Sequence, residues 1–182
     1  MNMRMVLLRH IMLEIANVAD LAEQSRSLYR DHPELGDLHR PLGKGLEFCK
    51  YLRNKYVGHF LPELTEKTFE WLPHTNALLG SREPDKQVAV SWLALETVIN
   101  TYVDETSGHK IFESETDLNY PPDQTRFLNF LGETALGAIA YVNRLIEVTR
   151  EYVDVPDMEK DWAELAIKAG ETNFEYLSKV RR

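Results

Sequence analysis

The chain has 182 residues, of which 43% are hydrophobic and 27% are charged, and its formal net charge is −8. This length and composition predict one globular domain over residues 1–182 and exclude an intrinsically disordered chain. The acidic balance argues against a surface devoted to coating nucleic acid, because such surfaces usually carry a basic face.

Cysteine usage and hydropathy indicate where the protein works. Cys49 is the only cysteine, so an internal disulfide is impossible and a reducing compartment is expected. The apolar run before Arg9 is too short for the core of a signal peptide. No stretch approaches the roughly 20 apolar residues that a membrane span needs. We therefore expect a cytoplasmic protein with no membrane partner.

Apolar residues recur at helical spacing in the N-terminal half of the chain. A first helix is expected over about residues 3–30, with a wide apolar arc. A second, amphipathic helix is expected over residues 38–57. Pro62 and Pro73 bracket a short third helix, because proline breaks the helical hydrogen-bond pattern.

The C-terminal half continues the same pattern. Residues 82–85 open a helix that we expect to end at Gly108, and residues 121–123 and 155–157 open the last two. Only residues 110–112 suggest an extended segment. The sequence therefore predicts an all-α fold, a helical bundle of about five helices.

The helix that starts near residue 121 contains unusually small residues in its middle: Gly132, Ala135, Gly137, Ala138 and Ala140. Small side chains let two helix backbones approach closely. Two interpretations stay open, which are tight packing within the chain and a seam between two copies.

The segment 38–57 contains one anomaly. On an ideal helix, Leu46 and Cys49 lie on an apolar face, and Arg53 projects from the middle of that face. An arginine cannot lose its proton to escape burial. It therefore needs a route to water, an internal carboxylate such as Glu96, or an anionic ligand at a concave site or dimer interface.

His59 follows Arg53 by six residues and would lie ~240° round a continuous helix. The helix is expected to stop first, because Gly58 is suited to a left-handed helix terminus and Pro62 blocks further propagation. A turn at this point would fold His59 back towards Arg53, with Asn54 beside both.

An arginine, a histidine and an amide without an acidic metal cluster suit RNA cleavage without metal. The imidazole of His59 would move a proton to or from the 2′-hydroxyl or the leaving oxygen. The guanidinium of Arg53 would stabilise the extra negative charge of the transition state.

The sequence Arg53-Asn54, four further residues and His59 resembles the motif of the HEPN superfamily (higher eukaryotes and prokaryotes nucleotide-binding). Members are small all-helical domains, and many are ribonucleases of toxin–antitoxin or phage-defence systems. The resemblance implies that Arg53 and His59 are catalytic and that Asn54 supports them. It also implies a homodimer in which two motifs face one active site, with an antitoxin protein as a possible partner.

A basic segment surrounds the motif within an otherwise acidic protein. Lys44, Lys50 and Lys55 lie between His39 and His59, where Glu47 is the only acidic residue. These lysines are expected to bind nucleic acid, and the alternative is a solvated helix face.

The second interpretation of the function is a non-catalytic helical module that uses the same cleft for a nucleotide or a protein. No metal is expected, because no metal-ligand pattern such as Glu-x-x-His appears in the sequence. No cofactor is expected either, since no glycine-rich phosphate loop or dinucleotide motif appears. Cys49 is expected to be buried and inert.

Overall fold

The computed structural model describes residues 3–58, 61–78, 80–104, 106–153 and 157–171. Over these residues the fold is all-α, as predicted, and it includes one short hairpin. The α-helices are α1 (Met3–Gln24), α2 (Pro33–His39), α3 (Gly43–Leu52), α4 (Pro62–Trp71), α5 (Pro84–Asn100), α6 (Pro121–Thr149) and α7 (Met158–Gly170). The short elements are η1 (Arg26–Arg30), η2 (Arg40–Leu42), η3 (Arg53–Val57), η4 (Pro73–Leu78), η5 (Arg150–Tyr152), β1 (Val103–Asp104) and β2 (Gly108–His109).

Contacts divide the chain into two compact units, residues 1–145 and residues 146–182. The first unit contains α1 to α5, the hairpin and most of α6. The second contains η5 and α7, whose N-terminus is capped by the Asp157 carboxylate accepting from the Glu159 backbone N–H. The expectation of a single domain stays a prediction.

The predicted helices are shorter and more broken than the apolar spacing indicates. The first ends at Gln24 rather than near residue 30, and a 3₁₀ segment, η1, follows it. The expected helix over residues 38–57 consists of the end of α2, the 3₁₀ turn η2, α3 and η3. Its apolar face is nevertheless buried, since Leu46 and Cys49 are almost fully inaccessible.

Gly108 does not end a helix, so that expectation is wrong. The helix α5 already stops at Asn100, and Gly108 lies in β2, paired with Asp104 of β1. Its φ of 82° suits a tight hairpin that only glycine enters without strain. The Asp104 carboxylate closes the turn by accepting two backbone N–H groups. The expected extended segment at residues 110–112 is a bend, so the strand lies earlier than predicted.

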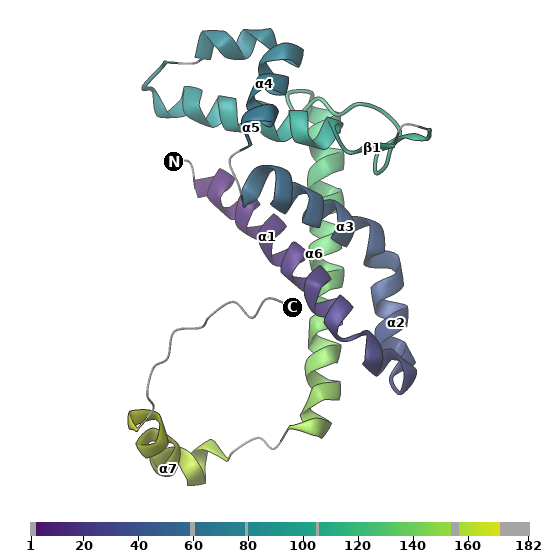
Figure 1. The fold of residues 1–182 in the computed structure, drawn as a ribbon, viewed down its shortest axis with the longest axis vertical. Helices are drawn as coiled ribbons and strands as arrows, with labels where there is room; N and C mark the ends of the chain where they lie inside the picture. The colour runs from purple at the N-terminus through teal and green to yellow at the C-terminus, as the bar shows by residue number, and fades with distance from the viewer. Residues whose placement is uncertain (1–2, 59–60, 79, 105, 154–156, 172–182) are drawn as a thin grey trace. The chain divides into compact units, whose positions relative to one another are not determined.

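The core of the first unit comes from one face each of α1, α3, α5 and α6. Figure 1 shows α1 beside α3 and α4 beside α5, and contacts place α1 against η3 as well. The buried side chains include Met12, Ile15, Leu46, Phe48, Leu52, Leu95, Ile99, Phe127 and Tyr141. This packing holds η3, which carries the first part of the candidate motif, against α1.

Two glycines allow α6 to approach α3 and η2 closely. A Cβ at Gly45 would lie 2.6 Å from Thr134 Cγ2, and a Cβ at Gly137 would overlap the Leu42 side chain. The small residue Gly137 therefore serves packing within the chain. Gly132 has open space around its Cα and Ala140 is exposed, so the dimer seam stays a prediction for that side of α6.

Because α3 and α6 lie in close contact at Gly45, one methyl group added there should change the stability of the protein. Gly45→Ala should lower the free energy of unfolding by about 1–3 kcal/mol, because the new Cβ overlaps Thr134 in a filled interior. Urea denaturation followed by circular dichroism measures this change.

The matched control is Gly43→Ala in the same helix, where no neighbouring atom lies within 4 Å. It should leave stability unchanged or raise it by up to about 1 kcal/mol. Equal effects of the two substitutions would contradict the packing described.

Candidate functional site

The motif begins in a π-helical turn at the end of α3. The Gly58 N–H donates to the Arg53 carbonyl over 2.7 Å, which closes the wider ring of a π-helix. Gly58 has φ −87°, so the expected left-handed terminus is wrong. Glycine serves a different purpose, because a Cβ here would lie only 3.0 Å from the Arg53 carbonyl oxygen. The regular helix ends earlier than expected, at Leu52, and the π-helical turn continues to Val57.

Arg53 has an internal partner. Its Nη1 donates to Asp20 Oδ2 of α1 over 2.6 Å, and its side chain is 21% exposed. Of the three possibilities that the sequence leaves open for Arg53, an internal carboxylate is therefore the one found. The suggested partner Glu96 is wrong, since that carboxylate instead accepts from the Leu118 backbone N–H. Arg53 lowers the pKa of Asp20 mainly by donating this hydrogen bond.

Lys50 belongs to the same charge cluster. Its Nζ lies 2.7 Å from Glu23 and 3.4 Å from Asp20, so two carboxylates of α1 face two cations of α3 and η3. The hydrogen bond to Glu23 is the main cause that raises the pKa of Lys50. Lys44 and Lys55 are exposed and pair with no described carboxylate. Part of the basic segment is therefore neutralised, and these two lysines remain available to an external anion.

Asn54 and His59 are the remaining residues of the motif. Asn54 is exposed, and its Oδ1 lies 3.5 Å from Arg53 Nε, at the limit of a hydrogen bond. His59 lies outside the described residues, so its separation from Arg53 stays a prediction.

Arg9 is the cation that the sequence interpretation missed. Its Nη2 donates to the Tyr56 carbonyl of η3 over 2.9 Å, and its guanidinium carbon lies 4.7 Å from the centre of the Tyr56 ring. Its Nε is buried and has no partner in the described part of the chain. An unsatisfied buried donor costs about 1–3 kcal/mol. Arg9 follows the buried Met5 by four residues, so a charge on the apolar face of α1 was the available signal.

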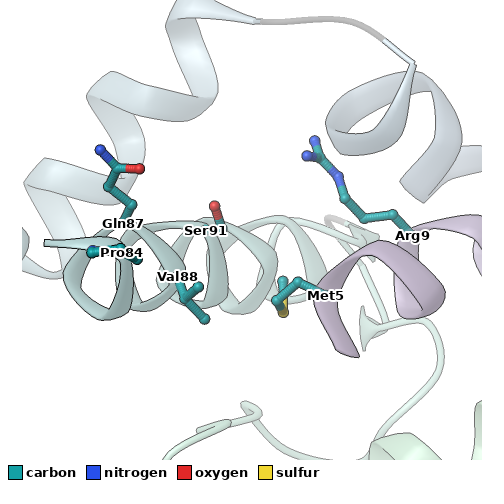
Figure 2. A pocket seen from close by; sticks show the side chains of 6 residues that line it. All are labelled: Met5, Arg9, Pro84, Gln87, Val88 and Ser91. Atoms are coloured by element: carbon teal, nitrogen blue, oxygen red, sulfur yellow. The ribbon is translucent and has the colours of Figure 1, made fainter. Parts of the chain in front are cut away.

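Arg9 lines two neighbouring cavities. One has a volume of about 160 Å³ and is shared with α5, where Gln87 and Ser91 project to the same side as the guanidinium (Figure 2). The other has a volume of about 510 Å³, and its wall includes Val57 and Gly58 at the end of the π-helical turn. The motif segment therefore borders a cavity that also contains an arginine.

The described residues give little support to a metal site, a reactive thiol or a membrane span. Within them, no group of three or more histidine, cysteine, aspartate or glutamate side chains is arranged to hold a metal ion. Burial raises the pKa of the Cys49 thiol to about 12, so the reactive thiolate is scarce at neutral pH. No described helix has the length and hydropathy of a membrane span.

Comparisons with family models, with curated proteins and with solved structures give no match. The functional assignment therefore depends on the motif and on the geometry around it.

The Asp20–Arg53 pair predicts a pH-dependent contribution to stability. Asp20→Asn should cost about 1 kcal/mol at pH 7, because a half-buried guanidinium loses its carboxylate. The pKa of Asp20 is lowered below 3.8, so its stabilisation is present above that pH and is lost as the pH falls through the lowered value. The difference in unfolding free energy between wild type and Asp20→Asn should therefore disappear at a pH well below 3.8.

The matched control for this measurement is Asp37→Asn. Asp37 pairs with Arg40 while both side chains are largely exposed, so its loss should cost at most about 0.5 kcal/mol. If the two asparagine variants had equal stability at pH 7, the Asp20–Arg53 pair would have no special role.

Proposed function

We propose that the chain is a metal-independent endoribonuclease of HEPN type. The observation that carries this proposal is the position of the motif: Arg53 and Asn54 begin a π-helical turn that ends at the wall of a cavity of about 510 Å³. A π-helical turn within a helix is frequently found at functional sites. It departs from regular helical geometry immediately before His59.

In the proposed reaction, the 2′-oxygen of RNA attacks the adjacent phosphorus while the bond to the 5′-oxygen breaks. His59 takes the proton from the 2′-hydroxyl or returns it to the leaving oxygen. The products are a 2′,3′-cyclic phosphate and a 5′-hydroxyl, and no metal or redox partner takes part.

Arg53 stabilises the negative charge that develops on the phosphate oxygens. The hydrogen bond that Nη1 donates to Asp20 does not occupy the other N–H groups of the guanidinium, and it fixes the orientation of the side chain. Asn54, exposed beside Arg53, supports the two catalytic residues. Lys44 and Lys55 bind the RNA backbone, whereas Lys50, placed in this set from the sequence, is held by Glu23 and contributes less.

The proposal includes a cellular setting. The enzyme acts in the cytoplasm as a homodimer in which two motifs form one site, in a toxin–antitoxin or phage-defence role with an antitoxin protein as partner. Because the net charge of the chain is −8, the approach of RNA depends on the local basic segment.

One observation favours a second candidate function. The carboxylate of Asp20 already balances the charge of Arg53. A guanidinium neutralised in this way stabilises a transition state less than a free one. A non-catalytic module that binds a nucleotide or a protein in the same cavity is the alternative.

Cleavage of labelled RNA in EDTA distinguishes the two functions. Wild type should produce 2′,3′-cyclic ends, and His59→Ala should reduce the rate at least ~100-fold, because the proton transfer is lost. His74→Ala, which changes an exposed histidine of η4, is the matched control and should keep full activity. Growth arrest on expression of wild type but not of His59→Ala would support the toxin role. Equal cleavage by wild type and His59→Ala, or none by either, would contradict the proposed enzyme.

A further inference from the structure

The half-buried arginines of the first unit differ in whether a described carboxylate neutralises them. Arg53, Arg126 and Arg144 each pair with a carboxylate. Arg9 forms no ion pair with any residue that the structure describes, and its Nε–H is buried without an acceptor. A permanent cation in this situation is expected to face an anion that is not part of the protein.

The surroundings of Arg9 fix it in place without neutralising it. The Tyr56 carbonyl accepts from Nη2, and the Tyr56 ring lies against the guanidinium. The Tyr56 hydroxyl donates to the Ser91 carbonyl, which ties η3 to α5. Both contacts position the fork of the guanidinium at the cavity between α1 and α5 and leave its charge uncompensated.

The smaller cavity suits a tetrahedral anion. Besides Arg9 it presents the Ser91 hydroxyl and the Gln87 amide from one side of α5 (Figure 2). No hydrogen bond of these two side chains to another described residue competes for them. A phosphate group accepts from several directions at once, whereas the oxygens of a carboxylate lie in one plane. The volume of about 160 Å³ leaves room for such a group.

The larger cavity suits an apolar group to which the phosphate would be attached. It shares Arg9 and Ser91 with the smaller cavity, so the two are adjacent. Its wall is mainly apolar and includes Leu64, Phe69 and Val90. An aromatic and aliphatic wall beside a phosphate site favours a flat ring system such as a nucleobase.

We propose that Arg9 binds the phosphate group of a nucleotide, with Ser91 and Gln87 as further donors and the cavity beside Val57 and Gly58 holding the base. This proposal does not depend on RNA cleavage. The nucleotide is either free or part of an RNA chain, and the chemistry that the site recognises is the same.

The test measures binding by isothermal titration calorimetry in the His59→Ala protein, so that any cleavage is removed. Adenosine 5′-monophosphate should bind at least ~10-fold more tightly than adenosine, because only the former carries the charge that Arg9 meets. Inorganic phosphate should bind more weakly than the monophosphate, because it leaves the apolar cavity empty. Equal affinity for adenosine and its monophosphate, or no binding of either, would overturn the proposal.

Charge changes at Gln87 test the site without removing a structural contact. Gln87 is exposed, and Gln87→Glu should weaken binding of the monophosphate by about 10-fold while Gln87→Lys strengthens it. Gln24→Glu is the matched control, since Gln24 is exposed on the same helix as Arg9 and lies roughly 22 Å further along it. Arg9→Gln should abolish the preference for the monophosphate, and circular dichroism checks that it folds. If Gln87→Glu and Gln24→Glu had the same affinity as the parent protein, the assignment would be wrong.

Competition with RNA identifies the source of the nucleotide. If a short unlabelled RNA displaces the monophosphate and Arg9→Gln weakens both, the site takes a nucleotide of the chain. If RNA does not displace it, the site takes a free nucleotide. Both results support a nucleotide at Arg9, and displacement by RNA that Arg9→Gln does not affect would contradict it.

Discussion

The ion pair between Asp20 and Arg53 determines how the motif segment lies in the protein. Lys50 of α3 pairs with Glu23 in the same way, so a step of three residues forward to Arg53 of η3 matches a step of three residues back along α1. This is the register that two antiparallel helices require, and both pairs lie on helix faces one turn apart. Because an arginine keeps its charge, moving α1 out of this register would leave Arg53 half-buried without a partner. The apolar face of α3 and the charge cluster therefore specify the same arrangement.

This register has a consequence for the candidate site. It directs Arg53 towards α1, where a carboxylate receives it, and brings Arg9 of the same helix to the Tyr56 carbonyl at the other end of η3. The two arginines thus differ in electrostatic state although both interrupt apolar faces. Arg53 is oriented and partly neutralised, whereas Arg9 has no ion-pair partner among the described residues and borders two cavities. A ligand with a phosphate group would meet Arg9 as the uncompensated charge and Arg53 as a fixed donor.

Much of the fold follows from the spacing of apolar residues, and the site follows only in part. Periodicity is sufficient for the helical class and for the burial of Leu46 and Cys49, because burial of one helix face is a local pattern. It does not reveal that Asp20 is the partner of Arg53, because that contact joins residues 33 positions apart on two helices. It also misassigns Gly58, since a glycine that permits a close carbonyl contact in a π-helical turn looks the same in sequence as one that ends a helix with positive φ. The role of Arg9 depends on the shape of cavities formed by four separate elements, α1, η3, α4 and α5, which no single segment encodes.

The central claim is that His59 and Arg53 act on one phosphate group. Nuclear Overhauser contacts between the ring protons of His59 and the side-chain protons of Arg53 test it most directly. The account predicts such contacts, within one chain or between two copies, because both groups must come within hydrogen-bond reach of the same phosphate. Contacts that place the His59 ring on the opposite side of the segment from Arg53 and Asp20, with none to Arg53, would contradict it.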